Sequence, residues 1–244
     1  MFGGVPIIAT TPADAAHQIS QLAAARDETP QHVHLVNAYT LSLIDSNPDY
    51  AQQLSIGSIN LPDGRPLSVV SKLMGHQPPL QQVRGPKLFL DVFDVGRDYG
   101  IKHYLLGSSP EVLEKLQRNL SERFPGCRIV GVESPPYRAL SPEEIEAQDE
   151  RILSMRPDIV WVGLGTPKQD MEATRITQET GIMSIAVGAA FDFAAGEVRE
   201  APRWMTNLCL EWAFRLVTEP RRLWRRYFFG NLKFLQIVLR SLVG

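Results

Sequence analysis

The chain has 244 residues, enough for one large domain or for one domain with an appendage. Hydrophobic residues make up 44% and charged residues 21%, which excludes a disordered, collagen-like or many-span membrane chain. The formal net charge of −2 hides an uneven distribution, because residues 199–244 hold nine Lys/Arg against three Asp/Glu. This C-terminal stretch, called the tail below, is expected to form a separate electrostatic unit.

The two cysteines, Cys127 and Cys209, cannot form a disulfide framework and belong to no Cys/His cluster, which favours reduced thiols and a cytoplasmic protein. Residues 1–11 lack a basic start and are interrupted by glycines and a proline, which is untypical of a signal peptide. The most apolar stretch, 227–243, is interrupted by Asn231, Lys233, Gln236 and Arg240 and is not expected to span a membrane. A helix that lies on the membrane surface is not excluded by this pattern.

Segments with helical spacing alternate with short apolar stretches. In chain order we expect a helix at 12–25, a strand at 32–36, a helix at 37–46, a strand at 55–61, helical spacing at 88–93, a strand at 102–107, a helix at 109–124, a strand at 129–132, a helix at 141–155, and strands at 159–163 and 182–187. Thr11 is the expected N-cap of the first helix, and Ser141-Pro142-Glu143-Glu144 is typical of a capping box.

Apolar strands separated by helices indicate a parallel sheet that is buried on both faces. The expected fold class is therefore α/β, with a Rossmann-like, mainly parallel sheet flanked by helices. We expect residues 1–198 to form this α/β domain and residues 199–244 a basic, aromatic-rich helical appendage. Because ligands of such sheets bind outside the carboxyl ends of the strands, the polar loops at these ends are the candidate site.

The segment Gly163-Leu164-Gly165-Thr166-Pro167-Lys168 begins like a dinucleotide-binding fingerprint. Lys168 stands where the third glycine would be, which disfavours a nucleotide-dependent oxidoreductase. The glycines would still let backbone approach a ligand, and Lys168 and Gln169 would add donors for an anion at the start of the next helix. An ordinary strand-to-helix turn is the alternative.

Two carboxylates and one arginine stand at other strand ends or loops. Asp63, in the turn Pro62-Asp63-Gly64, could act as a general base or cap its own turn. Asp192, between two phenylalanines, could hold a substrate hydroxyl or pair with a backbone amide. Arg84 could grip a phosphate or carboxylate, or could be a solvated surface residue.

The sequence predicts neither a metal site nor a cofactor. His32 and His34 would share one face of a strand, but no third ligand stands near them, so core or surface histidines are favoured. An Asp-x-Asp motif, which holds a divalent ion in many nucleotide-sugar enzymes, is absent. A site without metal would need fixed positive charge to stabilise a departing diphosphate.

The tail contains that charge. Its basic residues are interleaved with aromatic ones in the set Trp212, Phe214, Arg215, Arg221, Arg222, Trp224, Arg225, Arg226, Tyr227, Phe228 and Phe229. The pattern is typical of an amphipathic helix on an anionic membrane, with packing against the main domain as the alternative. No recognised nucleic-acid motif is present, so nucleic acid is not an expected partner.

Together the loops and the tail resemble the WecG/TagA/CpsF family of bacterial glycosyltransferases (glycosyltransferase family 26). The matching segments cover nearly the whole chain in order: Val36-Asn37-Ala38, Pro62-Asp63-Gly64, Arg84-Gly85-Pro86, Gly163-Leu164-Gly165-Thr166-Pro167-Lys168-Gln169, Gly188-Ala189-Ala190-Phe191-Asp192-Phe193-Ala194-Ala195-Gly196, Ala201-Pro202-Arg203-Trp204-Met205, Leu210-Glu211-Trp212, Arg215-Leu216, Glu219-Pro220-Arg221-Arg222 and Arg226-Tyr227. Any single segment is weak, but the set is specific.

The resemblance implies inverting, metal-independent transfer of a sugar from a UDP-sugar to a polyprenyl diphosphate-linked saccharide, at the cytoplasmic face of the cell membrane. The products of such enzymes are cell-wall polymers and exopolysaccharides. Residues 1–198 would then be the catalytic domain, with Asp63 as general base and Arg84 in the same site. The expected substrate-binding residues are Asn37, Gly165, Lys168, Gln169, Asp192, Arg215, Arg222 and Arg225.

This sequence departs from the family at one position of the site. Some relatives carry Thr-Pro-Asn where this chain has Leu35-Val36-Asn37, so the threonine hydroxyl is missing and a glucosyl or uronosyl donor is as plausible as N-acetylmannosamine. The rival functions are the oxidoreductase and a non-catalytic scaffold that binds membranes through its tail. A homo-oligomer is one way to cover the apolar side chains of the tail.

Overall fold

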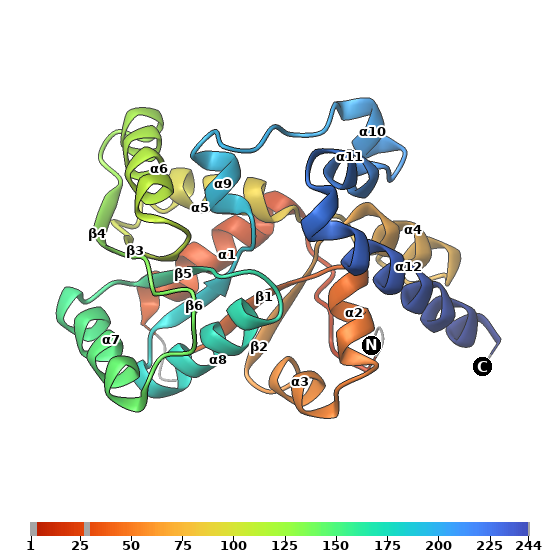
Figure 1. Cartoon of the computed structure of the whole chain (residues 1–244), viewed down its shortest axis with the longest axis horizontal. Coiled ribbons are helices and arrows are strands. Elements are labelled where there is room, and N and C mark those ends of the chain that lie inside the picture. The colour runs from red at the N-terminus through yellow and green to blue at the C-terminus, as the bar shows by residue number, and fades with distance from the viewer. Residues whose placement is uncertain (1–3, 27–29, 244) are drawn as a thin grey trace.

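The computed structural model describes residues 4–26 and 30–243, and a parallel six-stranded sheet lies at the centre of this part of the chain (Figure 1). The strands are β1 (His32–Val36), β2 (Ser58–Pro62), β3 (Lys102–Gly107), β4 (Arg128–Glu133), β5 (Ile159–Gly163) and β6 (Met183–Ala186). Their order across the sheet is β2-β1-β6-β5-β3-β4. The α/β class and the parallel sheet expected from the sequence are confirmed.

The helices that the structure describes cover both faces of the sheet and form the tail. They are α1 (Pro12–Ala25), α2 (Ala38–Ile44), α3 (Pro48–Gln53), α4 (Arg65–Leu73), α5 (Gly85–Val95), α6 (Pro110–Arg123), α7 (Pro142–Met155), α8 (Lys168–Thr180), α9 (Ala190–Ala194), α10 (Arg203–Asn207), α11 (Glu211–Thr218) and α12 (Pro220–Val243). Ser141 and Glu144 form the expected capping box at the start of α7.

The local sequence explains where these elements begin and end. Thr11 accepts a hydrogen bond from the backbone N–H of Asp14 at 3.1 Å and so caps α1, as expected. The strand expected at 55–61 begins instead at Ser58, because the end of α3 extends into this stretch: the N–H of Ser55 donates to the carbonyl of Gln52 at 3.0 Å. Helices α3 and α4 are short and were not predicted.

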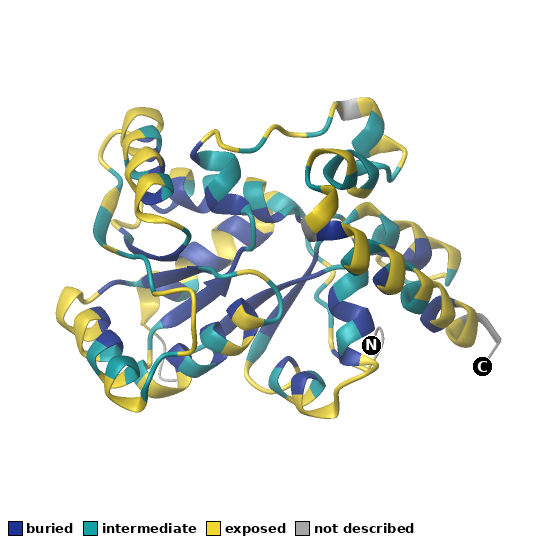
Figure 2. Cartoon of the chain, viewed as in Figure 1, coloured by how far each residue is buried: buried dark blue, intermediate teal, exposed yellow. Residues whose placement is uncertain are grey.

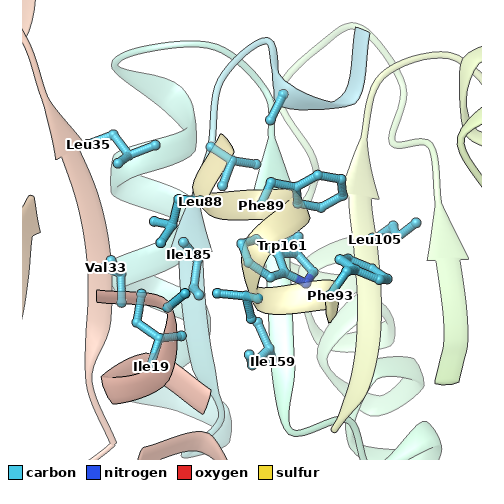
Figure 3. Packing of buried hydrophobic residues seen from close by; sticks show 14 of the residues in the cluster. Ile19, Val33, Leu35, Leu88, Phe89, Phe93, Leu105, Ile159, Trp161 and Ile185 are labelled. Carbon is cyan, nitrogen blue, oxygen red and sulfur yellow. The ribbon is translucent and has the colours of Figure 1, made fainter. Parts of the chain in front are cut away.

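One face of the sheet packs on α1, α5, α6 and α9 around a large aromatic group (Figure 3). The ring of Phe89 on α5 meets Trp161 of β5 edge to face, with the ring centroids 4.9 Å apart. The indole N–H of Trp161 donates to Nδ1 of His103 at 3.0 Å, so this buried nitrogen has a partner. This cluster is the main hydrophobic core and anchors α5, whose first residues reach the candidate site.

The opposite face is divided between two apolar clusters. Helices α7 and α8 cover β3, β5 and β6, whereas α2, α3, α4 and α12 pack together beyond β1. Buried polar side chains, among them His34, Asp170 and Ser184, lie on this face. Figure 2 shows the sheet buried beneath its helices and a row of exposed residues along α12.

The tail packs directly on the α/β domain. Helix α12 runs beside α2 (Figure 1), and its Ile237 and Val238 are buried in the same cluster as Leu41 of α2. A Cβ atom at Gly230 would stand only 3.1 Å from the ring of Tyr39, so the two helices approach closely there. The tail is thereby held near the carboxyl end of β1. In the described part of the chain, no helix is long and apolar enough to cross a membrane.

Candidate active site

Asp63 lies immediately after β2, at the carboxyl end of the sheet. Its backbone N–H donates to the carbonyl of Val36 on β1 at 2.8 Å, which holds the two strand ends together. Gly64 then turns the chain with a φ of +104°, a value that favours glycine. The Asp63 carboxylate is within hydrogen-bonding reach of the side chain of Asn37 and accepts from the backbone N–H of Gly85. The structure thus brings together two predicted site residues from neighbouring strands.

Asn37 has a structural role and a site role at once. Its side-chain oxygen accepts from the backbone N–H groups of Tyr39 at 3.0 Å and Thr40 at 3.2 Å, which caps α2. Because that oxygen is occupied by donors, the side-chain NH₂ group is the part that can donate to Asp63. The cap therefore fixes the donor that faces the carboxylate.

The Gly85 amide reaches Asp63 because α5 begins unusually close to β1. A Cβ atom at position 85 would lie 2.6 Å from Cδ1 of Leu35, so no larger residue fits without movement. Arg84 precedes this glycine as the N-cap residue of α5. The Arg84-Gly85-Pro86 segment thus contributes a backbone donor that its sequence alone did not indicate.

The carboxyl group of Asp63 has a perturbed pKa. Burial raises the pKa to about 6 from its usual 3.8, and the nearby carboxylate of Glu211 adds to this effect. The charge of Arg84 and the hydrogen bonds from Asn37 and Gly85 oppose it. The result is a carboxylate that is ionised at neutral pH yet far more basic than an exposed aspartate, as a general base requires.

Arg84 connects this carboxylate to the tail. Its guanidinium contacts Oε2 of Glu200 at 3.1 Å and Oε1 of Glu211 at 3.0 Å. Burial disfavours the charged form of Arg84, but the two carboxylates outweigh burial and raise its pKa. Arg84 is therefore not the solvated residue that the sequence left open. It is already paired with carboxylates, which makes it a link between Asp63 and α11.

Two half-buried arginines of the tail place positive charge at this end of the sheet. The guanidinium carbon of Arg226 lies 4.7 Å from the ring centroid of Tyr39, and that of Arg215 lies 5.6 Å from the ring of Phe193. The Nε atoms of both arginines are buried without a hydrogen-bond partner among the described residues. Burial lowers the pKa of Arg226, and the charge of Arg215 contributes to this shift. Buried donors of like charge form a site suited to an anion.

A second group of predicted residues follows β5 and β6. The side-chain oxygen of Gln169 accepts from the backbone N–H of Gly165 at 3.0 Å, and its amide lies against Gly188. Lys168, the first residue of α8, stands over the ring of Tyr137 at 5.5 Å. On α9, Asp192 accepts from the Ser108 hydroxyl at 3.5 Å.

The loops that follow β1 and β5 lie on opposite sides of β6. Strand β6 lies between β1 and β5. Neighbouring strands are about 4.8 Å apart, so the loop after β5 is roughly 10 Å from the loop after β1. This separation is too long for a direct hydrogen bond between the two groups. One extended ligand could contact both.

The tail arginines differ from the expectation. Arg215 reaches the site, whereas Arg225 is exposed and stands over Trp224, with its guanidinium carbon 5.3 Å from that ring. The side chain of Arg222 lies outside the described residues. Arg226 was named among the basic residues of the tail but not among the expected substrate-binding residues, yet its charge interacts with that of Asp63. The signal that could have found it is the buried stripe of α12, because Leu223 and Gly230 are buried on either side of it at helical spacing.

The comparisons with known proteins agree with the motifs. A family model described as the glycosyl transferase WecG/TagA/CpsF family matches residues 1–244. The chain is also 31% identical over 182 residues to a curated protein of Bacillus spizizenii, the N-acetylglucosaminyldiphosphoundecaprenol N-acetyl-beta-D-mannosaminyltransferase. This match covers 74% of the chain and 68% of the relative. The resemblance expected from the sequence is confirmed.

We expect Asp63→Asn to raise the free energy of unfolding at neutral pH. The folded carboxyl group has a pKa of about 6 against its usual 3.8, so the unfolded chain ionises first and the wild type loses stability as pH rises from about 4 to about 6. Two pKa units correspond to at most about 3 kcal/mol. Urea unfolding at pH 7.5 and pH 4 measures the gain, which should fall below about 1 kcal/mol at pH 4.

The matched control is Asp98→Asn, which neutralises an exposed aspartate in the turn after α5. Its unfolding free energy should differ from that of the wild type by less than about 0.5 kcal/mol at both pH values. If Asp63→Asn were less stable than the wild type at pH 7.5, the carboxylate would not carry the electrostatic cost described here.

Proposed function

Because the chain belongs to the WecG/TagA/CpsF family of glycosyl transferases, we propose that it transfers a sugar from a UDP-sugar to a saccharide carried on polyprenyl diphosphate. The name of the Bacillus spizizenii relative supports an N-acetylglucosaminyl diphosphate lipid as the acceptor class. The proposed role is cell-wall or exopolysaccharide biosynthesis. The observation that carries the proposal is the basic carboxylate of Asp63 close to the half-buried arginines Arg215 and Arg226, whose Nε atoms are buried.

Asp63 is the proposed general base of a single displacement. An acceptor hydroxyl attacks the anomeric carbon of the donor while the bond from that carbon to the UDP oxygen breaks. The hydroxyl proton passes to the Asp63 carboxylate, and the bonding electrons leave with UDP. Attack from the side opposite UDP inverts the configuration, and one carboxylate is sufficient because no glycosyl-enzyme intermediate forms.

Arg215 and Arg226 are proposed to bind the diphosphate of the departing UDP. Their buried Nε atoms lack partners among the described residues, and phosphate oxygens would satisfy these donors. Binding an anion there would also relieve the repulsion between the two guanidinium groups. Fixed positive charge of this kind stabilises a leaving diphosphate directly, which is the basis for proposing a metal-independent reaction.

The loops after β5 and β6 are the proposed binding site for the rest of the donor. Gln169 and Lys168 lie at the first turn of α8, where the ammonium group of Lys168 favours phosphate or sugar oxygens. Asp192, which interacts with Ser108, could hold a sugar hydroxyl. Leu35, in place of the threonine of some relatives, is buried in the core and supplies no hydroxyl. The donor panel should therefore include UDP-glucose and UDP-glucuronic acid beside UDP-N-acetylmannosamine.

The tail is proposed to dock on the inner membrane surface, where a polyprenyl acceptor lies. Large apolar side chains are exposed on α10, α11 and α12, namely Trp204, Leu208, Trp212, Val217, Trp224, Phe228, Phe229, Leu232, Leu235 and Leu239. Arg221, Arg225 and Arg240 are exposed on α12 as well. Figure 2 shows that exposed residues recur along the length of α12. Such a surface fits the interface of an anionic bilayer.

Asp63→Asn should abolish transfer. Purified protein, lipid-linked N-acetylglucosamine and each UDP-sugar are assayed for UDP release and an extended lipid product, with EDTA present. Removal of the base should lower kcat at least about 100-fold. In the wild type, kcat/KM should rise with pH through about 6 as the Asp63 carboxyl group loses its proton. Asp98→Asn is the matched control, and an Asp63→Asn enzyme within threefold of wild type would refute the assignment.

Arg226→Gln should weaken donor use more than Arg225→Gln. Loss of one charge-assisted bond to phosphate costs about 1.5–3 kcal/mol, so kcat/KM should fall roughly 10- to 100-fold, and the affinity for UDP should fall with it. Arg225 lies one residue away on the same helix but is exposed, which makes it the matched control. Equal effects of the two substitutions on UDP binding would contradict the proposed diphosphate site.

Membrane binding should depend on the exposed face of the tail. In sedimentation with anionic vesicles, the double change Phe228→Ser and Leu232→Ser should lower the bound fraction, with an affinity loss of about tenfold or more. The matched control is the pair Leu153→Ser and Met155→Ser on α7, which are also exposed. High salt should weaken wild-type binding. Equal binding by both double variants would argue against the tail as the docking surface.

A further inference from the structure

A buried chain of hydrogen bonds crosses the sheet face between its two apolar clusters. His32 and His34 of β1 meet through Nδ1 and Nε2 at 2.6 Å, and Nδ1 of His34 lies 3.2 Å from Oδ1 of Asp170 on α8. The hydroxyl of Tyr50 on α3 donates to Oδ2 of Asp170 at 2.9 Å. All four side chains are at most 4% exposed. Water therefore does not replace any of these bonds.

The direction of each bond follows from one fixed acceptor. Nε2 of His32 lies 3.0 Å from the carbonyl oxygen of Ile56, and a carbonyl can only accept. Burial, followed by the nearby His34, lowers the pKa of His32 to about 4, so its imidazole is neutral and Nδ1 is an acceptor. His34 must then donate from Nε2. A neutral His34 would present Nδ1 to Asp170 as an acceptor.

A proton must consequently lie between His34 and Asp170. A neutral imidazole acceptor facing a carboxylate at 3.2 Å would bring two lone pairs together in a buried place. Either His34 is doubly protonated and pairs with the carboxylate, or the carboxyl group of Asp170 keeps its proton and donates. The Thr174 hydroxyl does not supply this proton, because it donates to the backbone carbonyl of Asp170 at 3.0 Å.

This proton links the two halves of the candidate site. Asp170 directly follows Gln169, which belongs to the proposed donor side. His34 is three residues before Asn37, which faces Asp63. The two apolar clusters that carry α8 and α2 do not share buried members, so polar contacts such as the His34–Asp170 bond connect their helices.

We propose that His34 and Asp170 are positioning residues, whose shared proton fixes the first turn of α8, and with it Gln169, relative to Asn37 and Asp63. Neither residue touches the reacting atoms. Their effect is to keep the donor-binding loop at the distance from the base that one donor molecule requires. The catalytic consequence rests on the proposed function, whereas the placement of the loop does not.

The kinetic test compares an amide and an apolar side chain at position 170. In Asp170→Asn the new NH₂ group can donate to a neutral His34 while its oxygen accepts from Tyr50, so all constants should stay within about threefold of wild type. In Asp170→Leu both bonds are lost, and the KM for the UDP-sugar should rise about tenfold or more. The rise of kcat/KM through about pH 6 should persist, since Asp63 is unchanged.

Thr177→Val is the matched control, because Thr177 is buried on the same helix and its hydroxyl has no hydrogen-bond partner among the described residues. Its kinetic constants should equal those of the wild type. A folded Asp170→Leu enzyme with an unchanged KM would overturn the proposal, as would a loss in Asp170→Asn as large as in Asp170→Leu.

An NMR measurement tests the placement without relying on activity. Asp170→Leu should shift the backbone amide resonance of Gly165, which reports the 3.0 Å bond to Gln169, whereas Asp170→Asn and Thr177→Val should not. If no donor is turned over by the wild type, the proposed function fails and this resonance still decides the positioning role. If Asp170→Leu does not fold, Tyr50→Phe removes one bond to Asp170 and should shift the same resonance. An unmoved Gly165 signal would refute the inference.

Discussion

The rest of the site depends on the burial of one carboxyl group at the end of β2. Burial destabilises the charged form of Asp63, and its pKa is therefore raised to about 6. Asn37, Gly85 and Arg84 each reduce this destabilisation without removing it. Each of them requires a separate structural feature: the cap of α2, the close approach of α5 to Leu35, and the ion pairs between α5 and the tail. The fold thus maintains a carboxyl group of raised pKa instead of the most stable arrangement.

Sequence patterns predicted the parts of the site that depend on local structure. Asn37 and Asp63 were expected at strand ends, and the parallel sheet brings such ends to one edge, so their meeting followed from the fold class. The Arg84–Glu211 pair spans 127 residues, and the entry of Arg226 depends on how α12 packs against Tyr39 of α2. No local spacing encodes these contacts, because they depend on where a distant helix docks.

The histidines of β1 are a second case in which local spacing could not predict a distant contact. The sequence predicted that His32 and His34 share one face of the strand, and the contact between their rings confirms this. Their partner Asp170 is 136 residues further along the chain from His34, so the pattern could not reveal the proton that the pair needs. A buried polar chain is costly unless every member is bonded. This polar chain lies between the two apolar clusters that carry α8 and α2. Apolar contacts alone would let these helices shift relative to each other more easily.

The tail also acts on the base through charge. Arg84 lowers the pKa of Asp63, but the carboxylates of Glu200 and Glu211 bind the same guanidinium and weaken its effect. Glu211 further raises the pKa of Asp63 by its own charge. Both glutamates belong to the tail, so their carboxylates favour a more basic Asp63, whereas the positive charge of Arg226, which also interacts with Asp63, favours its ionised form. The docked tail therefore acts on Asp63 in both directions. It also brings Arg215 and Arg226, whose positive charge suits the leaving group. In the proposed reaction, proton acceptance by Asp63 and departure of the diphosphate would therefore both depend on the packing of α11 and α12.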